Sequence, residues 1–211
     1  MQQFTVGGFD KNMSYVVFDV ESREALIIDP TGDMSAAHAF IADTNLQVAG
    51  CVLTHTHADH VEQLRACIEK YTVPVFVHEN GLYVTKDFSS TTLTDLDCIE
   101  LNTLPIGVLY TPGHNLDSVC LYIAPQFSAT GNPLLITGDT VFVDGCGKTN
   151  EEMVRQLYDS LERIKALPPQ TVLYPGHDYG KTPTATIAEQ LLSNQYFLAA
   201  DFTSFKQLRL R

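Results

Sequence analysis

The chain has 211 residues and 45% of them are apolar, so it can bury a full core without disulfide support. Its 13 basic and 25 acidic residues give a formal net charge of −12, which argues against a nucleic-acid surface because phosphate binding needs clustered lysine and arginine. Five cysteines without a CxxC pair, no signal peptide and no apolar run near the ~20 residues of a membrane span predict a soluble, cytoplasmic protein.

The first third of the chain is predicted to be rich in β-structure. Apolar runs at residues 2–6, 15–20 and 25–28 indicate strands, and their short connections favour antiparallel hairpins. A helix follows at residues 35–44, with Ser35 as its N-cap candidate. His38 lies on this helix without a ligand-type neighbour, so we interpret it as structural or at the surface.

The middle of the chain alternates strands and helices. The apolar run 48–53 predicts a buried strand, residues 61–68 a helix, and residues 73–77 a strand that ends at His78, which has no motif and is interpreted as structural. The polar run 89–92 is expected to be a mobile loop.

The second half repeats this alternation, with predicted strands at 98–101, 106–111, 118–124, 134–136 and 171–174, and predicted helices at 151–167 and 183–193. Two similar halves predict two β-sheets packed face to face, with helices on both outer sides. The fold class is therefore α/β, a four-layer αββα sandwich of two mixed β-sheets. We expect one domain over residues 1–211, ending in a short helical tail.

Four potential metal ligands follow the strand at 48–53 directly, in the sequence Thr-His-Thr-His-Ala-Asp-His at 54–60. Imidazole and carboxylate groups suit zinc, iron and manganese, and no cysteine here indicates a closed structural zinc site. His55 and His57 can point the same way from an extended segment, whereas Asp59 and His60 fall where the next helix begins. This spacing predicts two metal sites side by side.

Three later segments share one design, an apolar strand that ends in a histidine or aspartate beside a glycine. They are Thr-Pro-Gly-His at 111–114, Thr-Gly-Asp-Thr at 137–140 and Tyr-Pro-Gly-His at 174–177. Together with the first motif they contain five of the seven histidines, which makes a chance placement a poor explanation.

This series resembles that of the metallo-β-lactamase superfamily, from about Phe4 to about Phe205. The resemblance implies two divalent metal ions, most often zinc, with iron or manganese as alternatives. It assigns His55, His57 and His114 to the first ion and Asp59, His60 and His177 to the second, with Asp139 bridging both. Asp59 and Asp139 are the expected catalytic residues, as metal ligands. Asp29 either lies near the metals and supports one of their ligands, or forms a turn before Pro30.

Two departures from the family pattern are expected to leave the ligands intact. The Asp-His pair usually continues into a glycine, but here Val61, Glu62 and Gln63 follow, which should lengthen or tighten the helix start. Asn115 replaces a small hydroxyl residue, and its amide can bond locally.

The segments at 138–148 and 175–179 resemble glyoxalase II, the hydroxyacylglutathione hydrolase that splits S-D-lactoylglutathione. The resemblance makes Lys148 and Tyr179 substrate-binding residues and implies a metal-bridging hydroxide that attacks the thioester. Only 34 residues follow His177 in this sequence, so we expect the helical C-terminal domain of long glyoxalase II proteins to be largely missing. The basic tail residues Lys206, Arg209 and Arg211 are interpreted as a solvated end.

Several alternatives remain open. Persulfide dioxygenases resemble this chain in the first motif and would hold one iron with His55, His114 and Asp139, but they usually carry an arginine where Lys148 stands. Hydrolysis of another ester or of a lactone is also compatible with the ligands. A β-lactamase or a nuclease fits less well, and a binding module without catalysis should have lost ligands. The expected partner is a small acyl-thiol such as a glutathione conjugate, bound by a monomer or homodimer, with no nucleic acid and no membrane.

Overall fold

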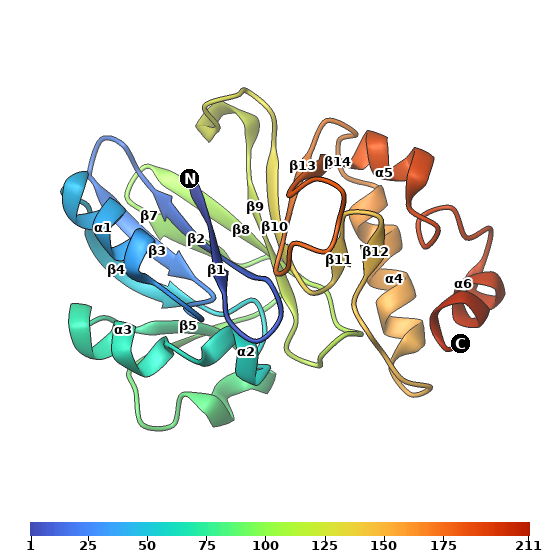
Figure 1. The fold of residues 1–211 in the computed structure, drawn as a ribbon, viewed down its shortest axis with the longest axis horizontal. Coiled ribbons are helices and arrows are strands. Elements are labelled where there is room, and N and C mark those ends of the chain that lie inside the picture. Colours follow the sequence, from blue (N-terminus) through green and yellow to red (C-terminus); the bar gives the residue numbers. More distant parts are fainter.

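The computed structural model describes residues 1–211 and contains two six-stranded sheets that face each other (Figure 1). The first sheet has the order β1-β2-β3-β4-β5-β6, antiparallel from β1 to β3 and parallel from β3 to β6. Its strands are β1 (Gln2–Gly7), β2 (Asn12–Phe18), β3 (Glu24–Ile28), β4 (Gln47–Val52), β5 (Val75–His78) and β6 (Ser90–Leu93).

The second sheet has the order β14-β13-β10-β9-β8-β7, in which only β10 and β13 are parallel. Its strands are β7 (Cys98–Leu101), β8 (Leu104–Tyr110), β9 (Val119–Ile123), β10 (Leu134–Gly138), β13 (Val172–Pro175) and β14 (Ala185–Thr186). A small ribbon, β11 (Val141–Phe142) and β12 (Gly145–Cys146), follows β10.

Helices cover the outer face of each sheet (Figure 1). The first sheet carries α1 (Ser35–Asp43), α2 (Ala58–Val61) and α3 (Leu64–Tyr71), and the second carries α4 (Val154–Lys165), α5 (Ile187–Ser193) and α6 (Phe202–Arg209). Short 3₁₀ helices lie at Glu79–Val84 and Pro125–Phe127.

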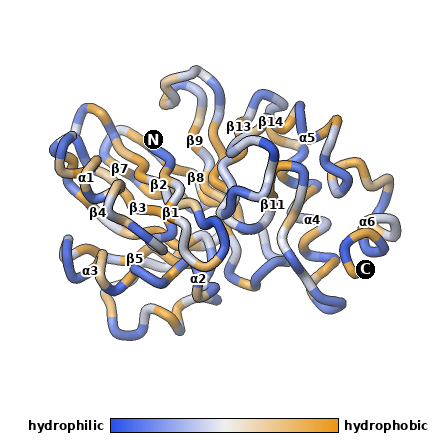
Figure 2. The backbone as a smooth tube through the Cα atoms, viewed as in Figure 1, coloured by the Kyte–Doolittle hydropathy of each residue, from blue (hydrophilic) through white to orange (hydrophobic).

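Three apolar layers hold the four structural layers together. Successive side chains of a strand face opposite sides, so Tyr15 and Val17 join the core between the sheets, whereas Val16 packs under α1 and α3. A third cluster lies between the second sheet and the helices α4 to α6. Figure 2 shows the hydrophobic colour along the strands of both sheets, with hydrophilic segments between α2 and β11. The αββα prediction is confirmed.

Several local predictions were wrong. Ser35 is not the N-cap of α1, because Met34 holds that position and no side chain caps it. The polar run 89–92 is not a mobile loop but contributes to β6, which pairs in parallel with β5 while three of its four residues stay exposed. The predicted helix at 183–193 starts later, at Ile187, after the capping box of Thr186 and Glu189.

The segment after the first motif also differs from its prediction, because Glu62 and Gln63 interrupt one helix and separate α2 from α3. The Glu62 carboxylate accepts a hydrogen bond from Gly32 N at 3.2 Å, which ties this break to the loop after β3. All five cysteines are free thiols, and only Cys98 is exposed. None of the helices combines the length and the apolar character that a membrane crossing requires.

Candidate metal centre

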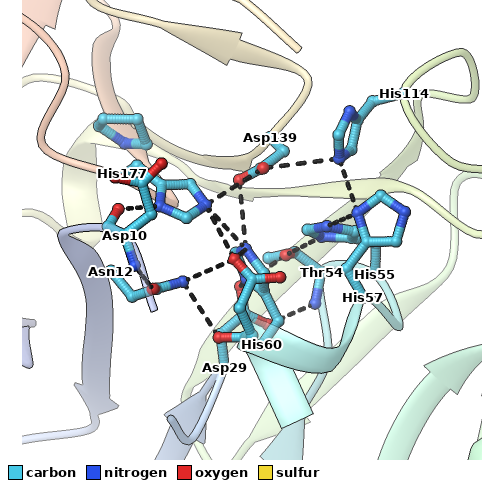
Figure 3. Close-up of polar contacts among 12 residues, drawn as sticks. Asp10, Asn12, Asp29, Thr54, His55, His57, His60, His114, Asp139 and His177 are labelled. Atoms are coloured by element: carbon cyan, nitrogen blue, oxygen red, sulfur yellow. Dashed lines mark hydrogen bonds and ion pairs between the residues drawn. The ribbon is translucent and has the colours of Figure 1, made fainter. Parts of the chain in front are cut away.

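The four strand-end segments meet at one edge of the sandwich (Figure 3). The loop after β4 presents His55 and His57, and α2 presents Asp59 and His60. The segments after β8, β10 and β13 bring three more side chains to the same place: His114, Asp139 and His177. The structure therefore brings all seven sequence-predicted ligand residues together.

The first group of ligand-type atoms comes from three histidines. His57 Nδ1 lies 3.1 Å from His55 Nε2 and 2.9 Å from His114 Nε2. Three ring nitrogens that converge in this way cannot all satisfy one another by hydrogen bonds, since each pair has at most one proton to share. A cation with tetrahedral preference fits this donor set.

The second group lies beside the first. His177 Nε2 is 3.3 Å from both His60 Nε2 and Asp59 Oδ2, and His60 Nε2 is 3.7 Å from Asp59 Oδ2. The three ligand atoms lie within 4.8 Å of one another, as do those of the first group. Two nitrogens and a carboxylate oxygen form a second donor set for a divalent ion.

Asp139 lies between the two groups. Its Oδ2 is 3.5 Å from His114 Nε2 and 3.2 Å from His177 Nε2, while its Oδ1 is 3.3 Å from His60 Nε2. Asp139 Oδ1 is buried without a hydrogen-bond partner. A buried carboxylate oxygen aimed at converging ring nitrogens is the observation that a bound cation best explains.

The outer nitrogens of four histidines are held by the surrounding chain. His60 Nδ1 donates to Asp29 Oδ2 at 2.9 Å, His177 Nδ1 to the Asp10 carbonyl at 2.6 Å, and His114 Nδ1 to the Lys148 carbonyl at 2.9 Å. His55 Nδ1 lies 3.2 Å from Thr54 Oγ1. These partners fix the tautomer and turn each Nε2 inward, as the groups that hydrogen-bond metal-bound histidines do.

Asp29 combines both roles considered for it. It has a left-handed backbone conformation, φ 49°, at the turn before Pro30. Its buried carboxylate also accepts bonds from Thr54 N at 2.7 Å and Thr54 Oγ1 at 2.5 Å besides the one from His60. The same residue therefore forms the turn before Pro30 and, through its carboxylate, holds Thr54 and His60 in the metal-binding loop.

The charges in the centre shift several pKa values. Burial lowers the pKa of His55 and of His114. Burial also acts to lower the pKa of His60, but the carboxylates of Asp29 and Asp139 outweigh it and raise this pKa to about 10. The pKa of His177 rises to about 9 because Asp139 and Asp59 outweigh the same effect. Without a metal, protons on His60 and His177 balance the carboxylates.

A cavity of about 910 Å³ opens beside the two groups, and both predicted substrate-binding residues line it. The Lys148 side chain is exposed and makes no ion pair. The Tyr179 ring stacks on His177 with centroids 4.8 Å apart, and its hydroxyl donates to Asp10 Oδ2 at 2.6 Å.

The cavity wall also contains residues without a sequence motif. Arg209 was interpreted as part of a solvated tail, but it lines the cavity and its Nε donates to the Gly147 carbonyl at 2.7 Å. Lys206 matches that interpretation better, since it pairs with the exposed Glu151 at 2.6 Å. Asp10 was missed as well, and no spacing or composition signal marks it.

Comparison with known proteins agrees with this arrangement. Residues 7–177 match the metallo-β-lactamase superfamily. A hydroxyacylglutathione hydrolase of Pelagibacter ubique is 32% identical over 81% of this chain and 68% of its own length. A probable polyketide biosynthesis zinc-dependent hydrolase of Bacillus subtilis, PksB, is 27% identical over 95% of this chain and 88% of its own length. The crystal structure of ETHE1 from Myxococcus xanthus superposes with a TM-score of 0.87, at 28% identity over 100% of this chain and 89% of that one. The chain therefore belongs to the metallo-β-lactamase superfamily.

Proposed function

We propose that this protein is a metal-dependent thioester hydrolase of the glyoxalase II type, which acts on S-D-lactoylglutathione or a related acyl-thiol. The observation that carries the proposal is a two-part ligand cluster, joined by Asp139, that opens onto a cavity containing the unpaired cation Lys148. The likeness to hydroxyacylglutathione hydrolases supports the same reaction.

The proposed centre holds two divalent ions, with zinc as the first expectation and iron or manganese as alternatives. His55, His57 and His114 hold one ion, and Asp139 lies where it can contact both. Asp59, His60 and His177 hold the other ion. When bound, such ions supply a water of lowered pKa and a Lewis acid for the thioester carbonyl.

The cavity residues are proposed to bind the thiol part of the substrate. The Lys148 ammonium is free to pair with a substrate carboxylate. Tyr179 already donates its only hydroxyl proton to Asp10, so its oxygen can accept a bond but not give one. Lys148 therefore selects a carboxylate, and Tyr179 selects an N–H group such as a substrate amide. A peptide-like thiol with an acidic end carries both groups.

The test begins with metal content by elemental analysis and hydrolysis of S-D-lactoylglutathione. We expect about two ions per chain and turnover that a chelator abolishes. In Lys148→Gln the KM should rise about tenfold with little change in kcat, because a charge-assisted contact to the substrate is lost. Lys206→Gln is the matched control, since Lys206 pairs with Glu151 outside the cavity. Two bound ions without turnover of any acyl-thiol would overturn the proposal.

The same hydrolysis assay can identify the thiol part of the preferred substrate. The PksB match spans more of both chains than the hydroxyacylglutathione hydrolase match does, so acyl-thiols other than glutathione conjugates belong in the substrate panel. Acyl-pantetheine thioesters provide an amide without the carboxylate. Preference for them over S-D-lactoylglutathione would move the substrate away from glutathione and leave thioester hydrolysis intact.

A second candidate is persulfide dioxygenase activity, with one iron held by His55, His114 and Asp139. The likeness to ETHE1 over the whole chain favours it. Oxygen uptake on glutathione persulfide by protein with a single iron, without thioester turnover, would establish this activity instead.

A further inference from the structure

The hairpin between β1 and β2 reaches the second ligand group although it contains no ligand itself (Figure 3). Its turn places Gly8 at φ 63° and Lys11 at φ 56°, and it leads into Asn12, which bridges to His177. Met13 N donates to the Gly176 carbonyl at 2.8 Å, and Asp178 N donates to the Lys11 carbonyl at 3.0 Å. The hairpin is therefore bonded on both sides of His177.

Asn12 has a fully buried side chain, 0% exposed, with a single satisfied orientation. Its Oδ1 accepts a bond from Asp10 N at 3.1 Å, which directs its amide nitrogen towards Asp59. That nitrogen donates to the Asp59 carbonyl at 3.0 Å and to Asp59 Oδ2 at 3.1 Å. One carboxamide thus holds both the backbone and the carboxylate of a residue 47 positions away.

The orientation of the Asp59 side chain depends on its bond to Asn12 more than the orientations of His60 and His177 depend on their own hydrogen bonds. Its side chain is 26% exposed, whereas those of His60 and His177 are 0% and 3% exposed and are enclosed by packing. A partly exposed carboxylate has several rotamers of similar energy, so a buried donor that bonds one oxygen selects among them. The bond to Oδ2 leaves Oδ1 and a lone pair on Oδ2 for a cation.

The same hairpin also supports a second ligand of this group. The Asp10 carbonyl accepts the bond from His177 Nδ1, so the Asp10-to-Asn12 segment holds Asp59 and His177 together. The first group receives its outer contacts elsewhere, from Thr54 and the Lys148 carbonyl. The hairpin is therefore specific for the second group.

We propose that Asn12 is a positioning residue for the second metal ion, acting through the carboxylate of Asp59. The inference rests on the two-ion centre of the proposed function, but not on the substrate. It predicts that loss of the carboxamide weakens one metal site and leaves the other unchanged.

The test measures stepwise zinc affinity by competition with a chelator, in the absence of substrate. In Asn12→Ala the affinity for one of the two ions should fall about 10- to 100-fold, as when other side chains that hydrogen-bond a metal ligand are removed, while the other ion stays at wild-type affinity. Asn12→Asp keeps the shape and the acceptor for Asp10 N but faces Asp59 with an oxygen, so it should show the same selective loss. This second variant covers the case in which Asn12→Ala fails to fold.

Asn194→Ala is the matched control. Asn194 is also 0% exposed, and its amide nitrogen donates to the Gly145 carbonyl at 3.0 Å, away from Asp59. It should lower the melting temperature without selective loss of one ion. A double-mutant cycle adds the second readout, because Asn12→Ala should have no further effect on zinc affinity when Asp59 is already alanine.

Equal weakening of both ions, or two ions at wild-type affinity in both Asn12 variants, would overturn the inference. So would a wild-type protein that binds only one ion. Selective loss of one ion in a protein that hydrolyses no acyl-thiol would support the inference and overturn the proposed function.

Discussion

His60 lies between two carboxylates, Asp29 on its outer side and Asp139 on its inner side. The outer bond runs from His60 Nδ1 to Asp29, which leaves Nε2 unprotonated for a metal when the ring is neutral. Asp29→Asn tests this arrangement cleanly, because asparagine tolerates the left-handed backbone at this position.

In Asp29→Asn an amide nitrogen can replace the oxygen that faces His60, so that the ring must accept at Nδ1 and carry its proton on Nε2. We expect the affinity for one ion to fall about 10- to 100-fold, as measured by chelator competition. The His60 tautomer, followed by nitrogen NMR of the zinc-free protein at high pH, should change with it. Asp33→Asn is the control, since the Asp33 side chain is exposed and its carboxylate accepts a bond from Ser35 N, away from the ligand groups. Unchanged affinity in Asp29→Asn would contradict this role.

Asp117 is a buried carboxyl group of a different kind. It is 2% exposed, both its oxygens lack hydrogen-bond partners, and burial raises its pKa. The pKa of this carboxyl group is higher in the folded protein than in the unfolded chain, where it is 3.8. The folded protein therefore loses stability as the pH rises from 3.8 through the folded-state pKa. At neutral pH the folded protein therefore carries an unfavourable charge.

We expect metal-free Asp117→Asn to be more stable than the metal-free wild type at pH 7, by roughly 1 to 3 kcal/mol, because the neutral amide costs less to bury. Urea unfolding at pH 7 and at pH 4 measures the difference, which should shrink at the lower pH. Asp87→Asn is the control at an exposed ion pair and should change stability by less than about 0.5 kcal/mol. Equal stability of Asp117→Asn and wild type at both pH values would show that Asp117 has a partner in solution.

Part of the centre could be predicted from the sequence. The ligand residues follow strand ends in short motifs, so the sequence marked them as candidates, and the family resemblance then assigned all seven to one centre. Asp10 and Asn12 belong to no motif, because Asp10 meets His177 across 167 positions and Asn12 meets Asp59 across 47. Such contacts exist only after the β1–β2 hairpin has paired and folded over the centre. Asp29 lay between these cases, since the sequence offered both a turn and a supporting role near the metals but did not identify Thr54 and His60 as its partners.

Hydrophobic periodicity predicted the helices and strands whose faces are buried. The buried run of β2 and the amphipathic stripe of α4 were recognised, with ends shifted by a few residues. Periodicity failed for β6, whose Ser90 to Thr92 are exposed, because pairing with β5 and not burial makes this segment a strand. It also failed at Glu62, where a side-chain bond to the loop after β3 ends the helix.

The loop that carries His114 is packed against α4 through Gly113. This glycine has φ +133°, and a Cβ atom there would lie 2.2 Å from Leu157 N and 2.3 Å from Leu157 Cα. Gly113→Ala must therefore move the loop away from the helix and displace His114. We expect a stability loss of about 1 to 3 kcal/mol or more, and weaker binding of one of the two ions.

Gly131→Ala is the matched control for this prediction. Gly131 also has a positive φ, +72°, but a Cβ atom there would meet nothing within 4 Å. It should cost only the backbone strain of a left-handed alanine and leave both ions at wild-type affinity. If Gly131→Ala and Gly113→Ala affect zinc affinity equally, the packing of α4 does not position His114.

For the whole molecule, the net charge of −12 and the metal centre are linked. Two divalent ions would neutralise part of this charge at the cluster, where Asp59 and Asp139 lie among five histidines. In the metal-free protein, protons on His60 and His177 neutralise part of this charge instead, since the pKa values of the two histidines are about 10 and about 9. Metal binding at neutral pH must therefore displace these protons.

The signs of the two pH effects are opposite. A histidine whose pKa is raised in the folded state stabilises that state fully below its unfolded value, 6.5, and this stability is lost as the pH rises through about 9 to 10. The melting temperature of the metal-free protein should therefore fall between pH 6.5 and 10. Zinc affinity should rise over the same range, because fewer protons remain to be displaced, so the gap in melting temperature between zinc-bound and metal-free protein should widen.

Calorimetry of zinc binding in buffers of different ionisation enthalpy counts these protons directly. At pH 7 we expect about two protons released per chain from His60 and His177, in addition to about one from the metal-bound water that becomes hydroxide; above pH 10 only the proton from this water should remain. His38 and His78 serve as internal controls, because neither belongs to the ligand groups and NMR should show them unchanged by zinc. Release of about one proton or none at pH 7 would mean that both ligand histidines are already neutral, and that another positive charge balances Asp59 and Asp139 in the metal-free protein.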